Sequence, residues 1–216
     1  MLYCYPERIT DKLLEVIARE EKLVKYLDIP IQHCNGDILR RMNRQGDADT
    51  LAALLNKIRQ MIPDITLRTT LITGFPGETE AQFTELAEFI QAQRFDRLGC
   101  FAYSQEEGTR AAEFPDQVPE DVRQHRADIL MEQQQLIVEE KNNARLGQVC
   151  TAVIEGYDRW AECWFGRTAA DAPDIDGKVF IRSETPLHIG DYVTVRLDEV
   201  LDYDFVGEVV TDESAQ

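Results

Sequence analysis

The hydrophobic period of this chain changes near Gly147, and this change constrains the fold more than any other feature. Before Gly147, short apolar runs bounded by turn residues alternate with segments of helical period. The apolar runs lie at 27–33, 65–73 and 96–104. Such alternation is typical of parallel βα units. After Gly147, five short strand patterns follow one another without a helical segment, which predicts a small antiparallel five-stranded β-barrel. The sequence therefore predicts two domains, residues 1–146 and 147–216.

The helical segments of the first domain carry recognisable signals. Residues 48–62 repeat Leu and Ile at helical spacing. Thr79 precedes a second amphipathic segment and Gln82 follows three residues later, so we expect a capping box there. A last helix, roughly 119–146, is rich in polar residues and poor in apolar ones. We expect it to be a solvated connector helix.

Charge and cysteine content narrow the functional classes. The chain has 23 Lys and Arg against 40 Asp and Glu, a net charge of -17. This balance disfavours direct binding to the phosphates of nucleic acid and favours a small molecule or a basic partner. No apolar run reaches the roughly 18 residues of a membrane span, so we expect no membrane association. The five cysteines are odd in number and widely spaced, which predicts reduced thiols in a cytoplasmic protein and no metal site.

The stretch TLITGFPGETEAQF at 70–83 places two glycines in a turn between a strand and a helix. A phosphate loop of the Walker type needs Lys and Ser or Thr after its second glycine, whereas Gly77 is followed by Glu78. A nucleoside triphosphate is therefore not the expected ligand. Glycine permits close approach of a flat group to the backbone at the carboxyl end of a parallel strand, and an adenine ring is such a group. A plain tight turn is the alternative.

Four motifs occur in a characteristic order: PIQH at the end of a strand, ITGFPGETE after the next strand, FAYSQEEGTRAA, and GRTAADAPDIDG within the predicted barrel. Together they resemble the radical SAM methylthiotransferases over nearly the whole chain, and most closely the members that modify a ribosomal protein. The resemblance implies a partial (β/α) radical SAM barrel followed by an OB-like TRAM domain. It also implies that S-adenosylmethionine binds at the turn 74–78. The complete enzyme would methylthiolate the β-carbon of an aspartate in a basic small-subunit ribosomal protein.

The resemblance further implies two [4Fe-4S] clusters, one held by CxxxCxxC and one by three cysteines of an amino-terminal domain. The five cysteines of this chain match neither pattern. The first residues, MLYCYPERIT, resemble the third strand of the barrel. We therefore expect the carboxyl-terminal part of a longer enzyme, inactive alone. Its first strand should then have an unpaired edge.

Six residues are expected to contact the cofactor. Gln32 and His33 end the PIQH strand, although a histidine in this position is as often structural. Arg68 either faces inward, where it would bind a ligand carboxylate bidentately, or is a surface charge. The expected set is Gln32, His33, Arg68, Gly74, Gly77 and Glu78.

Substrate contacts are expected in both domains. The last βα strand ends at residues 103 and 104, where side chains of such folds meet substrate, and acidic residues follow. Residues 148–216 hold 5 Lys and Arg against 15 Asp and Glu, a surplus that would attract a Lys- and Arg-rich protein. The expected set is Tyr103, Ser104, Glu106, Glu107, Asp171, Asp174 and Asp176.

Two other functions remain open. Trp160, Trp164 and Phe165 would stack on bases if the substrate were tRNA, as in other members of the family, but their alternation favours packing within the barrel. A non-catalytic binding module is the second alternative, since the cluster cysteines are absent.

Overall fold

The computed structural model describes residues 1–210, which fall into two compact units. The first is Met1–Ile137, and the second begins at Val138. The division lies inside the long helix α5 (Glu120–Asn143), before the boundary expected from the sequence at residue 146. Within residues 1–210, no helix combines the length and the apolar content that are needed to cross a membrane.

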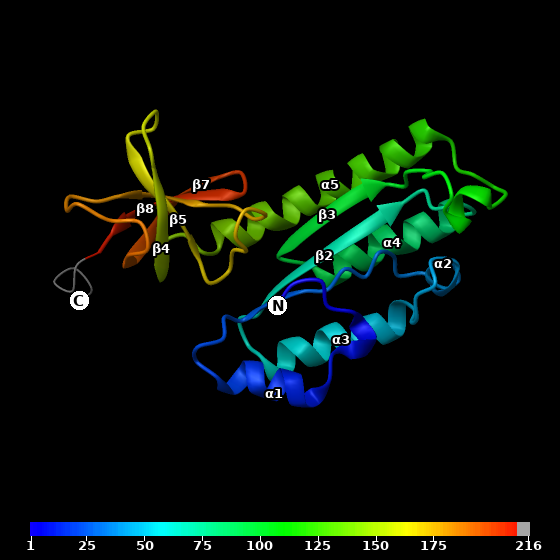
Figure 1. Cartoon of the computed structure of the whole chain (residues 1–216), viewed down its shortest axis with the longest axis horizontal. Helices are drawn as coiled ribbons and strands as arrows, with labels where there is room; N and C mark the ends of the chain where they lie inside the picture. Colours follow the sequence, from blue (N-terminus) through cyan, green and yellow to red (C-terminus); the bar gives the residue numbers. More distant parts are fainter. Residues whose placement is uncertain (211–216) are drawn as a thin grey trace. The chain divides into compact units, whose positions relative to one another are not determined.

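A three-stranded sheet in the order β1-β2-β3 forms the centre of the first unit (Figure 1). Its strands are β1 (Tyr26–Asp28), β2 (Thr66–Thr73) and β3 (Arg97–Ala102). Both pairings are parallel, which confirms the predicted βα units. β1 is shorter than the expected strand at 27–33, because Pro30 has no N–H to donate to a ladder. The chain rejoins β2 through a single bridge between Gln32 and Leu71.

The start of the chain, which resembles a strand in sequence, forms no regular strand. It nevertheless follows the outer edge of β1. The Cys4 N–H donates to the Asp28 carbonyl (2.9 Å), and the Asp28 N–H donates to the Met1 carbonyl (3.0 Å). Residues 1–4 thus extend the hydrogen bonding of the sheet beyond β1, and the unpaired outer edge expected for this first segment stays a prediction.

The helices of the first unit surround this sheet. In residues 1–210 they are α1 (Asp11–Arg19), α2 (Gly36–Arg41), α3 (Ala48–Met61), α4 (Glu80–Gln93) and α5, with the short 3-10 turns η1 (Pro6–Arg8) and η2 (Arg110–Glu113). α4 begins at the capping box of Thr79 and Gln82 that the sequence predicts. α1 and α2 were not predicted; both are short, and each buries only two residues. α1 lies beside α3 (Figure 1).

The core of the first unit lies between the sheet and the helices. Strand residues meet apolar side chains of α3, α4 and α5; the buried residues of this core include Leu27, Leu67, Leu71, Leu55, Ile58, Leu86, Ile90, Leu130 and Ile137. The expectation that α5 is a solvated connector is wrong for residues 127–137. Its apolar residues are few, but Ala127, Leu130 and Ile137 recur on one face, and that face is buried.

The second unit is a closed barrel in the order β4-β5-β6-β8-β7. The strands are β4 (Val149–Asp158), β5 (Cys163–Thr168), β6 (Val179–Arg182), β7 (Tyr192–Leu201) and β8 (Asp204–Val209). Five strands and closure agree with the sequence prediction. Four pairings are antiparallel, but β6 and β8 are parallel. β7 pairs with β4, so β8 returns between β7 and β6, an arrangement that strand patterns do not reveal.

Candidate functional site

A cavity of about 950 Å³ lies in the first unit, beyond the carboxyl ends of β1 and β2. α/β folds bind ligands at this edge of a parallel sheet. Apolar walls come from Ile72 at the end of β2 and from Phe75 and Phe114. The remaining lining residues are Gln32, Asp37, Arg40, Arg41, Met42, Asn43, Arg44, Arg110 and Ala111. The cavity thus combines an aromatic wall with a cationic rim.

Phe75 is the residue through which the glycine-containing turn reaches the cavity. Its ring meets Tyr103 edge-on, with centroids 5.2 Å apart, and Phe114 with centroids 6.2 Å apart. Offset and edge-on aromatic contacts of this kind fix ring orientation. The backbone of the turn is also tied to the segment after Phe114, since the Gly77 N–H donates to the Asp116 carbonyl (2.8 Å).

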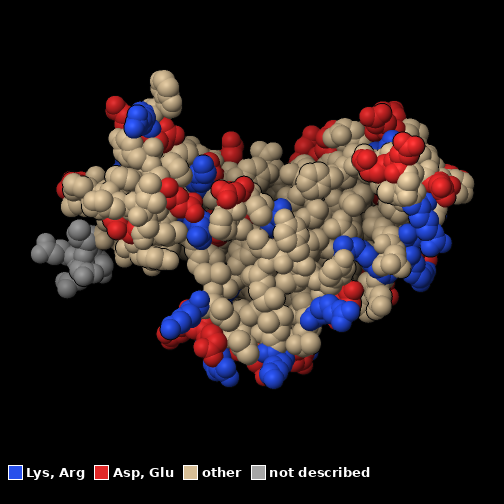
Figure 2. Space-filling view, viewed as in Figure 1, with Lys and Arg blue, Asp and Glu red and all other residues tan. Residues whose placement is uncertain are grey.

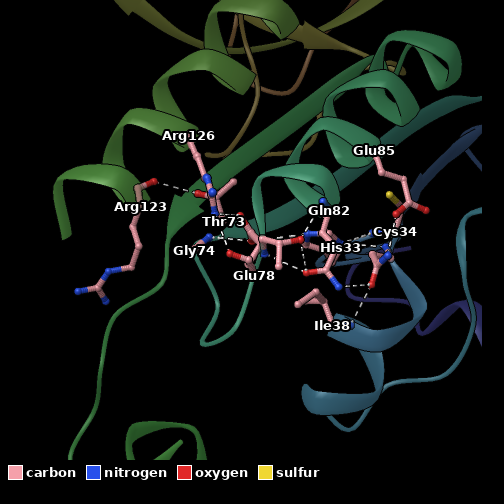
Figure 3. Close-up of polar contacts among 12 residues, drawn as sticks. His33, Cys34, Ile38, Thr73, Gly74, Glu78, Gln82, Glu85, Arg123 and Arg126 are labelled. Carbon is pink, nitrogen blue, oxygen red and sulfur yellow. Dashed lines mark hydrogen bonds and ion pairs between the residues drawn. The ribbon is translucent and has the colours of Figure 1, made fainter. Parts of the chain in front are cut away.

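Glu78 holds the turn closed from inside (Figure 3). Its side chain is 0% exposed. Oε2 accepts the Gly74 N–H (2.8 Å), and Oε1 accepts from Arg126 Nη1 of α5 (2.8 Å). A buried carboxylate needs such a paired and hydrogen-bonded environment. The predicted contact of Glu78 with a cofactor is wrong, because both of its oxygens are used within the protein.

His33 is likewise completely buried. Its Nδ1 accepts the N–H groups of Cys34 (3.0 Å) and Asn35 (2.9 Å). Nε2 lies 3.6 Å from Glu78 Oε2, beyond hydrogen-bond distance. Asn35 in turn caps α2 through Asp37 N–H (3.0 Å). The predicted cofactor contact of His33 is therefore wrong, because the ring shapes the start of α2 from the interior.

The two glycines of the turn make room for side chains of this chain. A Cβ on Gly74 would overlap Arg123 of α5, and a Cβ on Gly77 would overlap the guanidinium of Arg41. Both glycines have positive φ, +68° and +81°, which side chains rarely tolerate. Neither lines the cavity. Arginines occupy the space that a Cβ would need, and a ligand contact of the backbone at these positions stays a prediction.

Gln32 is placed at the cavity, as the sequence suggested. Its φ of +67° is uncommon for a residue other than glycine. Two hydrogen bonds to β2 hold it there: its N–H donates to the Thr70 carbonyl and its carbonyl accepts the Ile72 N–H, both at 2.9 Å. The structure thus maintains a strained backbone next to a cavity, which is a frequent mark of a functional site.

Arg68 lies elsewhere. It is near the start of β2 and does not line the cavity. Its Nη1 is 3.0 Å from Asp28 Oδ1, and the Asp28 side chain is 1% exposed. In this structure the carboxylate partner of Arg68 belongs to β1, and binding of a ligand carboxylate by Arg68 stays a prediction.

The four expected substrate contacts after β3 do not line the cavity. Tyr103 packs against Phe75, which lines the cavity. The buried hydroxyl of Tyr103 has no hydrogen-bond partner among residues 1–210. Ser104 Oγ donates to Glu106 Oε1 (2.7 Å) within an exposed loop that also contains Glu107. Their contact with a substrate remains a prediction.

The three expected acidic contacts in the barrel differ from one another. Asp171 is 7% exposed, and its Oδ2 accepts from Thr168 N–H (3.1 Å) and Thr168 Oγ1 (2.7 Å). Its predicted role in recruiting a partner is wrong, because it stabilises a turn. Asp176 is half-buried and accepts the Ala172 N–H (2.8 Å). Asp174 is exposed.

The aromatic residues of the barrel also differ. Trp164 packs against Tyr157, with ring centroids 5.1 Å apart, as the packing interpretation requires. Trp160 is 98% exposed, so that interpretation is wrong for this residue. The reason is that Trp160 lies in the turn after β4 ends at Asp158, where the alternation of the strand no longer applies.

Sequence reasoning missed the arginines at this site. Arg41 and Arg110 place their guanidinium groups 5.3 and 5.9 Å from the centroid of the Phe114 ring. Figure 2 shows Lys and Arg side chains gathered over the region of α2. The run RRMNR at 40–44 is a cluster of positive charge in an acidic chain, and this signal was available in the sequence.

The cysteines of this chain do not fit an iron–sulfur cluster, which needs several thiolates close together. All five are free, and no three His, Cys, Asp or Glu side chains of residues 1–210 gather as a metal site. Burial raises the pKa of the Cys34 and Cys100 thiols to about 12. Both therefore stay protonated near neutral pH.

Comparisons with known proteins agree with this architecture. Residues 1–90 match the model of the radical SAM superfamily, and residues 146–210 match the TRAM domain. The chain is 49% identical over 210 residues to the ribosomal protein uS12 methylthiotransferase RimO of Desulfitobacterium hafniense, covering 97% of this chain and 47% of the relative. Proteins of the same name from Acetivibrio thermocellus and Syntrophotalea carbinolica are 44% and 45% identical, each over 99% of this chain and 47% of the relative.

The chain thus spans about half the length of the curated relatives it matches. Among solved structures, coproporphyrinogen III oxidase (HemN) from Escherichia coli, described as a radical SAM enzyme, matches with a TM-score of 0.48 and 17% identity. That match covers 77% of this chain and 44% of the other.

Proposed function

Because this chain belongs to the RimO family of radical SAM methylthiotransferases, we propose that it supplies the cofactor cavity and the substrate-docking barrel of such an enzyme. The complete enzyme would methylthiolate the β-carbon of an aspartate in ribosomal protein uS12. The observation that carries the proposal is the cavity beyond the carboxyl ends of β1 and β2, since nine of its twelve lining residues, Gln32 and Phe75 among them, lie within the matched radical SAM region.

The cavity fits S-adenosylmethionine in size and in chemistry. Ligand sites of proteins usually measure about 300–1,000 Å³, with mostly apolar walls and a few polar groups. The wall of Ile72 and Phe75 suits an adenosyl group, and the Gln32 side chain offers both a donor and an acceptor. When bound, the cofactor supplies the radical chemistry, and the protein orients it and excludes water. We propose direct contacts from Gln32 and Phe75, with Glu78 and Gly74 shaping the turn that carries Phe75.

The barrel is proposed to recruit the protein substrate by charge. Its arginines are largely used internally: Arg196 pairs with Asp198 and Glu208, and Arg167 pairs with Glu155. Other carboxylates, at Asp174, Glu199 and Asp202, are exposed. An acidic surface steers a basic protein toward it, and the effect weakens with salt. A cytoplasmic location belongs to the same proposal and agrees with the five free cysteines.

A tRNA substrate is the second candidate. It is favoured by one observation, the 98% exposed Trp160, which offers a stacking surface to an unpaired base. The acidic barrel argues against it, because phosphate contacts supply most of the affinity for nucleic acid.

The test is a titration of this chain with purified uS12 and, separately, with tRNA at low and high ionic strength. We expect binding to uS12 that weakens with salt and is reduced by the double variant Asp174→Lys, Glu199→Lys. Glu21→Lys, an exposed change of the same sign in the first unit, serves as the control and should leave binding unaltered. Tight binding of tRNA, or binding of uS12 that ignores the barrel variants, would contradict the proposal.

A further inference from the structure

Among residues 1–210, two arginines in the cationic rim of the cavity have neither a carboxylate partner nor a hydrogen bond to the protein. Arg41 ends α2, and Arg110 begins η2. Both guanidinium groups lie against the Phe114 ring, at 5.3 and 5.9 Å from its centroid. Among residues 1–210, neither has a carboxylate partner, whereas Arg68 and Arg126 both do.

The other charged residues of the lining are already engaged. Asp37 pairs with Arg40, so its charge is compensated within α2. Arg44 Nη1 donates to the Pro30 carbonyl (2.8 Å), and its guanidinium covers the Tyr5 ring. Arg44 keeps its positive charge, but these contacts already hold its guanidinium. Arg41 and Arg110 are therefore the cavity arginines whose N–H groups remain available to a ligand.

The environment of Arg41 prepares it to bind an anion. Its guanidinium lies so close to Gly77 that the Cβ of any other residue there would overlap it. The same guanidinium lies against the Phe114 ring. Contact with an aromatic face restricts the guanidinium plane while leaving its N–H edge available. A guanidinium whose plane is already fixed loses less entropy when it binds a carboxylate bidentately.

We propose that Arg41 and Arg110, supported by Phe114, form a clamp that binds a carboxylate group of the ligand entering this cavity. Two cations suit a single carboxylate, and the apolar walls accommodate the rest of a small organic group. A nucleic acid backbone is disfavoured, because it needs many cationic contacts and this chain has a net charge of -17. The carboxylate belongs either to a free amino-acid group, such as that of S-adenosylmethionine, or to an acidic side chain of a polypeptide. The clamp does not depend on which substrate the barrel recruits.

The two sources can be separated with small probes, followed by chemical shifts of backbone amides in the intact chain. One pair of probes is L-methionine and L-methioninamide, which differ in the free carboxylate. The other pair is a blocked tripeptide with a central aspartate and the same tripeptide with asparagine. At least one acid is expected to bind at least tenfold more tightly than its amide, with shifts at Arg41, Arg110 and Phe114.

Variants test the residues themselves. Arg41→Gln and Arg110→Gln should each weaken binding of the preferred acid about tenfold, and Arg41→Lys should weaken it less, because the charge is kept while the planar fork is lost. Arg19→Gln, in α1 and paired with Glu20, does not line the cavity; it is the control and should bind as the original chain does. Helical circular dichroism of each variant verifies folding.

Binding that is equal for acid and amide in both pairs, or equal in Arg41→Gln, Arg110→Gln and the control, would overturn the clamp. So would the absence of binding by either acid. Should either arginine variant fail to fold, the salt dependence of acid binding by the original chain decides: affinity that does not fall with ionic strength overturns the proposal. Failure of uS12 to bind the barrel would leave these outcomes unchanged, so the two proposals fail separately.

Discussion

The two units of this molecule place their charges differently. In the first unit, the Glu78 and Arg126 pair is buried beneath a turn, and Arg41 and Arg110 line a cavity without a carboxylate partner among residues 1–210. In the barrel, the ion pairs lie at the surface, as with Arg196 and Asp198, while the buried Asp171 caps a turn. The comparison teaches that charge in the first unit orders the backbone around a cavity from within, whereas the ion pairs of the barrel remain at its surface.

The largest effect should come from breaking the buried pair. Arg126→Ala leaves the Glu78 carboxylate buried without its partner, and we expect a loss of about 3–5 kcal/mol in unfolding free energy. Both tryptophans of the chain are in the barrel, so urea denaturation followed by circular dichroism at 222 nm reports mainly on the first unit, and tryptophan fluorescence on the second. Only the first transition should move.

Arg40→Ala is the matched control, since it removes an exposed pair and should cost at most about 1 kcal/mol. An equal loss for Arg126→Ala and Arg40→Ala would mean that the buried pair does not organise the first unit.

In the barrel, we expect the larger loss of stability from a substitution that disturbs a backbone contact, and not from the loss of an ion pair. A Cβ on Gly166 would overlap the Val153 carbonyl of the neighbouring strand, and that backbone has little room to move. Gly166→Ala should therefore cost about 1–3 kcal/mol and shift the fluorescence transition alone. Gly99→Ala, where a Cβ meets only the Phe101 ring at ordinary distance, should change neither transition.

A smaller effect is expected at the start of α4, the helix that follows the cavity turn. Thr79 Oγ1 accepts the Gln82 N–H (3.3 Å), and loss of such a cap costs about 1 kcal/mol. Thr79→Ala should therefore lower the urea concentration at the midpoint of the unfolding transition that circular dichroism reports. In Thr84→Ala the hydroxyl removed lies inside the helix, and stability should not fall. A loss in Thr84→Ala as large as that in Thr79→Ala would rule out capping as the cause.

The smallest effect concerns thiols of the first unit. Burial raises the pKa of Cys34 and Cys100 from about 9 to about 12, so stability from keeping them neutral is present below pH 9 and lost as pH rises toward 12. At pH 8 we expect mass spectrometry to find neither residue alkylated by iodoacetamide in the folded chain, and all five cysteines alkylated in urea. Rapid labelling of Cys34 in the folded chain would show that this interior opens readily.

The structural features that the sequence predicted correctly are those that depend on local sequence signals. The strand at 65–73 and the Thr79 capping box depend on neighbouring residues, and both are present. The roles of His33, Glu78 and Arg68 could not be predicted, because their partners lie 40 to 48 positions away in the sequence. The glycines of the turn were correctly taken as sites of close approach, but the approaching groups are Arg123 and Arg41.

The cavity's role as a cofactor site is tested most directly by titrating S-adenosylmethionine into the isotopically labelled chain and following its backbone amide signals. The account predicts saturable shifts at Gln32, Ile72 and Phe75, with the barrel strands unchanged. Saturable shifts confined to the barrel, or unaltered cavity signals at millimolar cofactor, would contradict it.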